Sequence, residues 1–555
     1  MTATTELLLR KNDRIVFLGD SITEQQLYTN YVESYLASRY PELQLTFFNA
    51  GWGGDTAPGG VSRLDRDVLS LRPTLVTICY GMNDGRYTPP TDEIRDTFVA
   101  GMRQLVARLK SAGVRVVLLT PGMVDDTVNP LLADSAYNQR GLRILADEVL
   151  RLAAVEHLPA ADLHKLMNDV DRKAKAADPK YTMIPDSVHP DPAGHLVMAF
   201  GVLQGLGVPP RRQAVSIDLD ANTVVTAEGV TAGRLHPNPY GFTVDLHLDR
   251  LPFFVEPAAR KVLPFLPFQE TYNELKLCVR GLPAERGYFR SEAMRTASLP
   301  AQAFAHGINM FDLWALGPVR QAESVYRYTL EKDQVYFKLW RALALNGLNS
   351  PYHNTKAHAA AARMLPALDR GRDKLLTGRR ALACRLNVVA TSQAGEPLLS
   401  GDFISQWSLL GPFPKPYGDD RLGGEAAFSA QAPRLSREWL PHDLDLLNPG
   451  QNLNLAFGPQ LDCFAYGVTL IESPVAQSAE LLIGSDDGCA VWLNGMQFWK
   501  NLDVARGLTA DQDRVPVALR AGTNVLLIKI AQGVGGWGFC ARFTGLKKPV
   551  ATIRP

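Results

Sequence analysis

The segment Gly19-Asp20-Ser21 is well placed for covalent chemistry, because it follows directly on the apolar run at 14–18. A serine at the end of a buried strand stands at the carboxyl edge of the sheet, where ligands bind in α/β folds. Its hydroxyl becomes an effective nucleophile only when a base lies within hydrogen-bonding reach. Taken alone, the segment favours a simpler role, in which Ser21 caps the following helix.

Three further segments favour the nucleophile over the helix cap as the role of Ser21. Asn49-Ala50-Gly51-Trp52-Gly53-Gly54-Asp55 follows the apolar run at 45–48, and Gly81-Met82-Asn83-Asp84 follows the run at 74–80. Asp186-Ser187-Val188-His189-Pro190 lies just before the last apolar helix of this region. If the runs are parallel strands, all four loops converge on one edge of the sheet.

Together these loops supply the groups that acyl transfer requires. Ser21 is the expected nucleophile, His189 the base that takes its proton, and Asp186 the carboxylate that orients the imidazole. The backbone N–H groups of Ser21 and Gly54, with the side-chain amide of Asn83, are the expected oxyanion donors.

Four neighbouring residues are expected to line the substrate pocket: Asp20, Trp52, Gly53 and Asp84. Trp52 either walls an acyl pocket or packs beneath the glycine loop, and the sequence leaves both open. Asp20 lies beside the nucleophile, where local hydrogen bonding suits it better than a place in the triad.

Asp162 and His164 form a rival acid–base pair. Positions at the surface or at a strand end are favoured for them.

The pattern around these residues predicts the elements that position them. Apolar runs of strand length alternate with longer amphipathic stretches, which is typical of an α/β three-layer sandwich with a parallel sheet. The expected strands are 14–18, 45–48, 74–80 and 114–120, and the clearest expected helices are 93–110 and 134–155.

The four blocks, in this order, resemble the signature blocks of the SGNH/GDSL hydrolase family. The resemblance covers about 12–206. It implies a flavodoxin-like sheet, no metal or organic cofactor, Ser21, Asp186 and His189 as the triad, and Gly54 and Asn83 as oxyanion donors.

The whole chain predicts a multidomain protein. We expect a hydrolase domain at 1–208, a small β-rich module at 209–300, a helical region at 301–395 and a C-terminal β-sandwich of jelly-roll type at 396–555. The run Leu-Pro-Phe-Leu-Pro-Phe at 263–268 is expected to pack on the hydrolase domain or to roof its site. Asn494-Gly495 predicts a hairpin, and Ala521-Gly522-Thr523 predicts a second one.

The C-terminal region resembles accessory β-sandwich modules of the galactose-binding or PA14-like kind, through Gly484-Ser485-Asp486-Asp487-Gly488 and Val491-Trp492-Leu493-Asn494-Gly495. Asp486 and Asp487 could ligate Ca²⁺, although an ordinary Asp-Gly turn is favoured. Trp492, Trp499 and Trp537 form either a sugar-stacking surface or part of the core.

Composition excludes several classes of partner. Of 555 residues, 46% are hydrophobic and 21% charged, with a formal net charge of +1, so nothing favours nucleic acid or an anionic membrane. No window reaches the length of a membrane span, and no signal peptide is visible, so a cytoplasmic location is expected unless a leader was removed. The six scattered cysteines suggest neither a disulfide framework nor a zinc site. One bridge among Cys463, Cys489 and Cys540 stays open.

The function expected is that of a serine carboxylester hydrolase that removes O-acetyl groups from carbohydrate. The carbohydrate part rests on association with the β modules. The alternatives are a lipase, lysophospholipase or thioesterase of the same family, and a glycan-binding protein without catalysis. The oligomeric state is not predicted.

Overall fold

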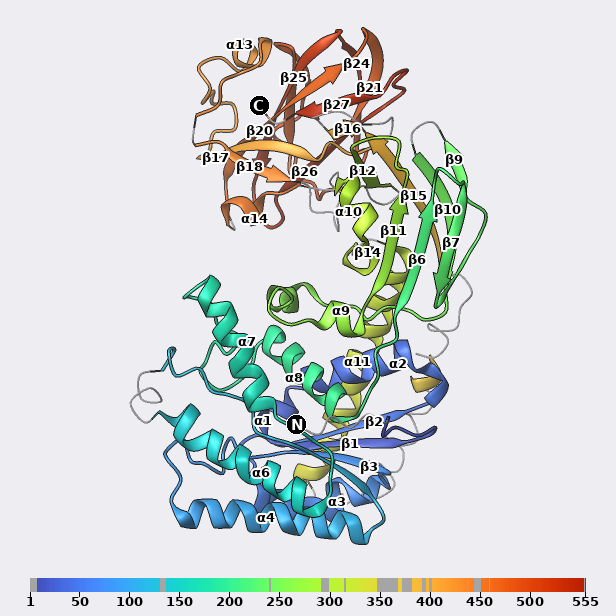
Figure 1. The fold of residues 1–555 in the computed structure, drawn as a ribbon. Coiled ribbons are helices and arrows are strands. Elements are labelled where there is room, and N and C mark those ends of the chain that lie inside the picture. Colours follow the sequence, from blue (N-terminus) through green and yellow to red (C-terminus); the bar gives the residue numbers. More distant parts are fainter. Residues whose placement is uncertain are drawn as a thin grey trace.

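A computed structural model describes most of the chain (Figure 1). The described residues are 7–129, 136–238, 241–290, 299–313, 316–346, 368–371, 382–391, 396–398, 402–436, 438–443, 451–458, 460–553 and 555.

The N-terminal unit is built on a five-stranded parallel sheet in the order β2-β1-β3-β4-β5. Its strands are β1 (Arg14–Gly19), β2 (Thr46–Gly51), β3 (Leu75–Cys79), β4 (Arg115–Leu119) and β5 (Ala160–Ala161). Gly19 is in register with Gly51 on one side and Cys79 on the other, so three strands end level at one edge. The first four strands confirm the predicted ones. The fifth has only two residues, too few for a pattern to reveal.

Helices cover both faces of this sheet, as a three-layer sandwich requires. Phe17 packs into the core shared with α2 and α8, whereas Val16 and Leu18 pack into the core shared with α3 and α4. The helices are α1 (Ser21–Glu24), α2 (Leu27–Arg39), α3 (Ala57–Asp67), α4 (Asp92–Ser111), α6 (Arg143–Glu156), α7 (Leu163–Ala177) and α8 (Pro192–Gly205), with short 3-10 turns at Pro41–Leu43 and Leu69–Leu71 and a π-helical turn at Asn138–Leu142. The predicted helix at 93–110 is α4. The one at 134–155 is α6 with the π-helical turn before it, and its first two residues lie outside the described residues.

The middle region forms two small sheets. One has the order β14-β11-β6-β7, and the other β13-β12-β15-β10-β8, with β9 paired to β10. Their strands are β6 (Gln213–Asp218), β7 (Thr223–Glu228), β8 (Val230–Ala232), β9 (His236–Asn238), β10 (Gly241–Leu248), β11 (Leu275–Arg280), β12 (Arg286–Phe289), β13 (Leu299–Pro300), β14 (Ile308–Asn309) and β15 (Ala383–Thr391). The expectation that 301–395 is helical is therefore wrong at its end, because β15 is bonded between β10 and β12. This pairing stabilises a strand that local sequence did not reveal.

Two helices of the middle region, α9 (Phe268–Tyr272) and the long α11 (Gly317–Asn346), pack against the N-terminal unit, whereas α10 (Ala301–His306) packs on the strands of its own region. The region also has 3-10 turns at Pro257–Val262 and Met310–Asp312. Phe268 lies 6.1 Å from Phe200 of α8 between ring centroids, and Phe265 lies 5.7 Å from Tyr181. The expected packing of 263–268 on the hydrolase unit is thus confirmed.

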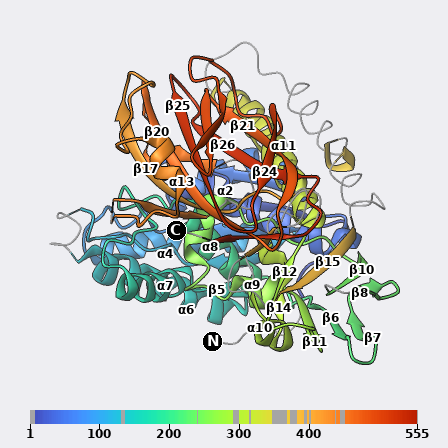
Figure 2. The ribbon, with the colours of Figure 1, turned by 90° about the horizontal axis from the view of Figure 1, so that it is seen from above.

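The C-terminal region contains two antiparallel sheets, which lie at the far end of the molecule from the parallel sheet (Figure 1). Viewed from above, their strands project over α2 and α8 (Figure 2). One sheet runs β16-β27-β20-β25-β22-β23, with β17 paired to β20 and β18 to β17, and the other runs β19-β26-β21-β24. The elements are β16 (Glu396–Leu398), β17 (Gln406–Pro414), α13 (Glu425–Ala430), β18 (Leu440–Asp443), β19 (Gln451–Asn452), α14 (Leu453–Phe457), β20 (Cys463–Ser473), β21 (Gln477–Asp486), β22 (Cys489–Leu493), β23 (Met496–Lys500), β24 (Asp513–Leu519), β25 (Gly522–Gln532), β26 (Gly538–Thr544) and β27 (Val550–Ile553).

The two turn predictions in this region have opposite outcomes. Asn494-Gly495 joins the paired strands β22 and β23, with both φ angles positive (52° and 85°), as a two-residue hairpin requires. The second prediction is wrong, because β24 pairs with β21 in one sheet while β25 pairs with β20 and β22 in the other. The turn at 521 therefore crosses between sheets. A jelly-roll arrangement stays a prediction.

Two alternatives for the C-terminal side chains are corrected. Trp492 and Trp537 are 4% and 3% exposed and pack in apolar cores, and half-buried Trp499 packs against one of these cores, so the three form no sugar-stacking surface. The Asp487 carboxylate accepts hydrogen bonds from the backbone N–H groups of Arg506 (3.1 Å) and Gly533 (2.6 Å), and a Ca²⁺ site at Asp486 and Asp487 stays a prediction. All six cysteines are unpaired, so the bridge considered among three of them does not form.

Among the described residues, none of the helices combines the length and apolar character needed to cross a membrane.

Candidate active site

Ser21, His189 and Asp186 lie side by side at the carboxyl edge of the parallel sheet. Ser21 Oγ is 2.9 Å from His189 Nε2, and His189 Nδ1 is 2.7 Å from Asp186 Oδ2. Ser21 is the first residue of α1, directly after β1, and the other two lie in the loop between α7 and α8. The side chains of His189 and Asp186 are 35% and 56% exposed, so the group is open to a ligand from solvent.

The Asp186 carboxylate is held by its own loop. Its Oδ1 accepts hydrogen bonds from the backbone N–H groups of Val188 (2.9 Å) and His189 (2.6 Å). Partial burial raises the pKa of Asp186, but these two N–H groups and the His189 ring outweigh it, so the pKa lies below its ordinary value. The Asp186 carboxyl group is therefore ionised at neutral pH, where it can accept a hydrogen bond from His189 Nδ1.

Asp125 holds the same loop through two hydrogen bonds. Its backbone N–H donates to the carbonyl of Ser187 (3.0 Å), and its Oδ2 accepts from the Thr182 hydroxyl (2.8 Å). Ser187 is buried with φ of 77°, an unusual conformation for serine that these contacts maintain. Sequence reasoning did not identify Asp125, because no motif marks its distant contact.

The predicted oxyanion donors Gly54 and Asn83 lie on the two neighbouring loops. Gly54 has φ of +73°, a left-handed conformation that glycine adopts without strain. Asn83 Nδ2 donates to the Asp55 carbonyl (3.0 Å), while its Oδ1 accepts from the Tyr87 hydroxyl (3.1 Å). Tyr87, which the motifs did not reveal, thus sets which way the amide points.

Asp20 and Asp84, two of the residues expected to line the pocket, are engaged with the backbone, and their place in the pocket stays a prediction. Both are buried, at 3% and 8% exposed. Asp20 caps α1 by accepting from the N–H of Ile22 (3.0 Å), and Asp84 accepts from the N–H groups of Ala57 (2.9 Å) and Gly81 (3.1 Å). Short acidic side chains at loop ends saturate backbone donors that would otherwise be unpaired.

Arg63 is a structural residue that the sequence did not reveal. It is buried on α3 and donates to the carbonyls of Ala50 (2.8 Å) and Gly19 (3.1 Å) and to the Asp55 carboxylate (2.8 Å). Arg63 therefore connects the ends of β1 and β2 to Asp55, in the loop that follows β2.

Comparison with known proteins agrees with this geometry. A family model described as the GDSL-like Lipase/Acylhydrolase family matches residues 17–197. The N-terminal region is a GDSL-like acylhydrolase domain. An acetylxylan esterase of Geobacillus stearothermophilus is 26% identical to it over 217 residues, which are 35% of this chain and 94% of the relative.

Two further relatives extend the comparison. An isoamyl acetate-hydrolyzing esterase of Saccharomyces cerevisiae is 24% identical over 170 residues, 28% of this chain and 71% of the relative. The structure of a gut microbial diltiazem-metabolizing enzyme matches with a TM-score of 0.60 and 20% identity, over 70% of this chain and 100% of that one. Because the family model ends at 197, the fold shared with this last structure extends beyond the GDSL-like domain.

Trp52 is half-buried at the rim of the GDSL-like domain and contacts α11. The guanidinium carbon of Arg341 lies 3.5 Å from a ring centroid of Trp52, and the Trp340 ring packs edge-on at 6.0 Å. Arg341 also pairs with Glu24 of α1 (2.9 Å). Arg341 is 320 positions after Ser21, so no local pattern could have assigned it to this rim.

A groove adjoins Trp52 on the side of α3. Its volume is about 400 Å³, within the range of small-molecule sites. It is lined by Trp52, Asp55, Gly59, Ser62, Arg63 and Arg66. Gly53 is exposed beside it, where a Cβ atom would lie 2.6 Å from the Glu24 carboxylate.

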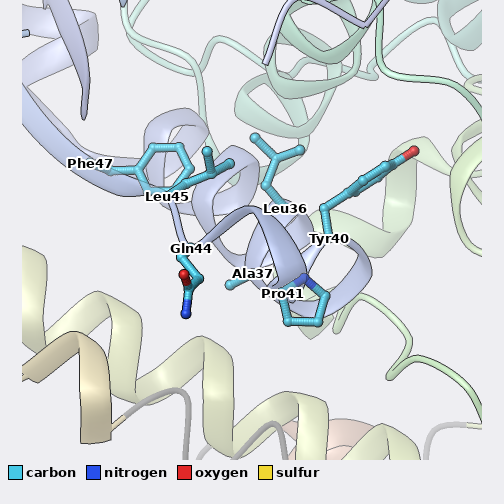
Figure 3. Close-up of a pocket in the computed structure, with 7 residues that line it drawn as sticks. All are labelled: Leu36, Ala37, Tyr40, Pro41, Gln44, Leu45 and Phe47. Atoms are coloured by element: carbon cyan, nitrogen blue, oxygen red, sulfur yellow. The ribbon is translucent and has the colours of Figure 1, made fainter. Parts of the chain in front are cut away.

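A second hollow lies between the end of α2 and the start of β2 (Figure 3). It is lined by Leu36, Ala37, Tyr40, Pro41, Gln44, Leu45 and Phe47. It holds about 10 Å³, the space of one water molecule at most, and it lies at the amino end of β2, opposite to Ser21. It is not a substrate site.

Asp162 and His164 do not form an acid–base pair. Asp162 caps α7 at the N–H of Lys165 (2.9 Å) and pairs with Arg143 (3.0 Å). His164 is buried, and its Nε2 lies 2.9 Å from the carbonyl of Asn138.

Over the described ranges, no group of three or more histidine, cysteine, aspartate or glutamate side chains is arranged to hold a metal ion.

Proposed function

We propose that the GDSL-like domain is a carboxylester hydrolase of short acyl groups, with Ser21, His189 and Asp186 as its catalytic triad. The observation that carries the proposal is the pair of hydrogen bonds, 2.9 Å and 2.7 Å, that link the three side chains in the order nucleophile, base and orienting carboxylate.

The mechanism follows from these contacts. His189 Nε2 accepts the Ser21 proton as Oγ attacks the ester carbonyl, and Asp186 stabilises the imidazolium that forms. The tetrahedral oxyanion is bound by the backbone N–H groups of Ser21 and Gly54 and by the Asn83 amide. The imidazolium then protonates the leaving alcohol. Water, activated by His189, releases the acid from Ser21.

The acyl group we propose is acetyl. Two relatives of the domain carry names that state an acetate ester as the substrate, acetylated xylan in one and isoamyl acetate in the other. They agree on the acid and differ in the alcohol, so the proposal is stronger for acetyl than for the alcohol.

For the alcohol we propose a carbohydrate. The groove beside Trp52 is lined by an aromatic ring with hydroxyl, carboxylate and guanidinium groups, which together suit a polar, ring-shaped molecule. The C-terminal module adds no support, because two of its three candidate tryptophans lie in the cores.

The test compares the wild type with Ser21→Ala on p-nitrophenyl acetate, butyrate and octanoate, on acetylated xylo-oligosaccharides and on isoamyl acetate. We expect the variant to lose at least about 10⁴-fold in kcat. Ser70→Ala is the matched control, because Ser70 is exposed in the 3-10 turn that follows α3 and its hydroxyl donates to the carbonyl of Arg66 (2.6 Å).

A preference for octanoate would overturn the acetyl assignment, and a preference for isoamyl acetate over the oligosaccharides would replace the carbohydrate by a small alkyl alcohol. If the wild type released no acid from any ester, the hydrolase proposal would fail and a glycan-binding role would replace it.

A further inference from the structure

A fully buried histidine outside the triad lies between the two elements that carry Ser21 and His189. His195, on α8, is 0% exposed, and its Nε2 is 2.8 Å from Gln25 Oε1. Because an amide oxygen can only accept, Nε2 carries the proton. The other ring nitrogen, Nδ1, is buried with no hydrogen-bond partner among the described residues.

Both residues of this hydrogen bond, Gln25 and His195, are bonded through their backbones to residues at or near the triad. Gln25 closes α1, and its backbone N–H donates to the carbonyl of Ser21 (3.0 Å). The backbone N–H of His195 donates to the carbonyl of Asp191 (2.9 Å), two residues after His189. One side-chain bond therefore joins the nucleophile helix to the start of α8 across 170 positions of sequence.

A second, indirect connection runs through α2. The His195 ring stacks on Tyr28 of α2, with centroids 6.1 Å apart and planes 10° apart. The Tyr28 hydroxyl lies 2.9 Å from Thr23 Oγ1, which belongs to α1.

The imidazole also stays neutral under working conditions. Burial, and to a smaller extent the nearby His189, lower the pKa of His195 to about 3. The bridge between His195 and Gln25 therefore adds no charge near the triad.

We propose that His195, through Gln25, is a positioning residue that sets the distance between Ser21 and His189. The inference rests on the proposed function, since it assigns how that triad is held. Displacement of reacting groups by about 1 Å can lower turnover by about 10²-fold. Loss of the bridge should therefore lower kcat and leave KM nearly unchanged.

The experiment uses the full-length chain with p-nitrophenyl acetate. His195→Phe keeps a ring against Tyr28 and removes the donor, and Gln25→Ala removes the acceptor. Each should lower kcat by about 10- to 100-fold, with KM within about 3-fold. The double variant should lose no more than either single one, because both remove the same bond. Gln25→Glu, which keeps an acceptor oxygen, should restore most of the turnover.

The matched control is His164→Phe. His164 is also buried (2% exposed), but its Nε2 bonds the carbonyl of Asn138 in the π-helical turn and not a residue of α1. It should lower the unfolding temperature as much as His195→Phe does, with kcat retained. Equal losses of kcat in both phenylalanine variants would mean a general packing effect and would overturn the proposal. Unchanged kcat in Gln25→Ala would overturn the proposal too. Because Gln25 is exposed, we expect its variant to fold, and it provides the test in case His195→Phe does not fold. An inactive wild type would instead contradict the proposed function.

Discussion

At the scale of single residues, two buried carboxyl groups, Asp20 and Asp84, lie in the loops that follow β1 and β3. Burial raises the pKa of Asp20 to about 7, with the Ile22 N–H opposing and Asp84 and Asp55 adding to the rise. Burial likewise raises the pKa of Asp84 to about 6, against three backbone N–H groups. These carboxyl groups hold the backbone under Ser21, and they cost stability once ionised.

Asp20→Asn should therefore change the pH dependence of stability. A carboxyl group whose pKa rises on folding stabilises the fold most below its ordinary value of 3.8, and this contribution is lost as the pH rises through about 7. The difference in unfolding free energy, variant minus wild type, should grow by about 2–3 kcal/mol between about pH 5 and pH 8. Denaturant unfolding at both pH values measures it.

Asp92→Asn serves as the control for this comparison. The Asp92 side chain is 87% exposed, so its replacement should give nearly the same difference at both pH values. A flat difference for Asp20→Asn as well would show that Asp20 titrates normally.

At the scale of elements, α11 lies outside the matched family region and yet completes the α/β unit. Its Tyr336 packs edge-on against Phe48 of β2, with centroids 5.6 Å apart. Its buried Trp340 contacts Trp52 and donates to Asp67 Oδ1 (3.3 Å). Its buried Lys332 pairs with Glu33 of α2. The helix thus covers the β2 edge of the sheet, and its Trp340 and Arg341 reach Trp52 at the rim of the domain.

Trp340→Ala should accordingly destabilise the hydrolase unit, by about 3–5 kcal/mol, because a large buried side chain leaves a cavity in a shared core. Equilibrium unfolding in guanidinium chloride measures the loss. Leu339→Ala, at the adjacent position but 40% exposed, should change stability by less than about 0.5 kcal/mol. Similar effects of both substitutions would show that α11 is not docked as described.

At the scale of the whole molecule, the apolar cores of the described residues do not follow the domain boundaries predicted from the sequence at 208 and 300. One apolar cluster runs from Leu9 to Val388 and includes Phe200 of α8 together with Phe268 of α9. The C-terminal sheets have clusters of their own, from Ile404 to Val550. The last strand of the first part, β15, and the first strand of the C-terminal part, β16, belong to different sheets.

Fragments should reflect this division. A fragment of residues 1–392 should fold and keep its esterase activity, and a fragment of 396–555 should unfold cooperatively on its own. A fragment of 1–208 should aggregate, because it exposes the apolar faces of α2 and α8 that the middle region covers. Soluble, active 1–208 protein would contradict the shared core.

The sequence by itself determined the candidate residues of the site and the parallel sheet that carries them. Parallel strands end at one edge of a sheet, so residues that follow successive strands must meet there. This geometry made Ser21, His189, Asp186, Gly54 and Asn83 predictable from motifs.

Only the tertiary structure decided which residues surround that group. His195 and Gln25 are 170 positions apart, and Arg341 reaches Trp52 from a different region, so no periodicity links them. The burial of Asp20 and Asp84 depends on how helices pack over their loops. Likewise, β24 and β25 are adjacent in sequence yet lie in different sheets, because pairing is decided by long-range contacts that a short turn does not encode.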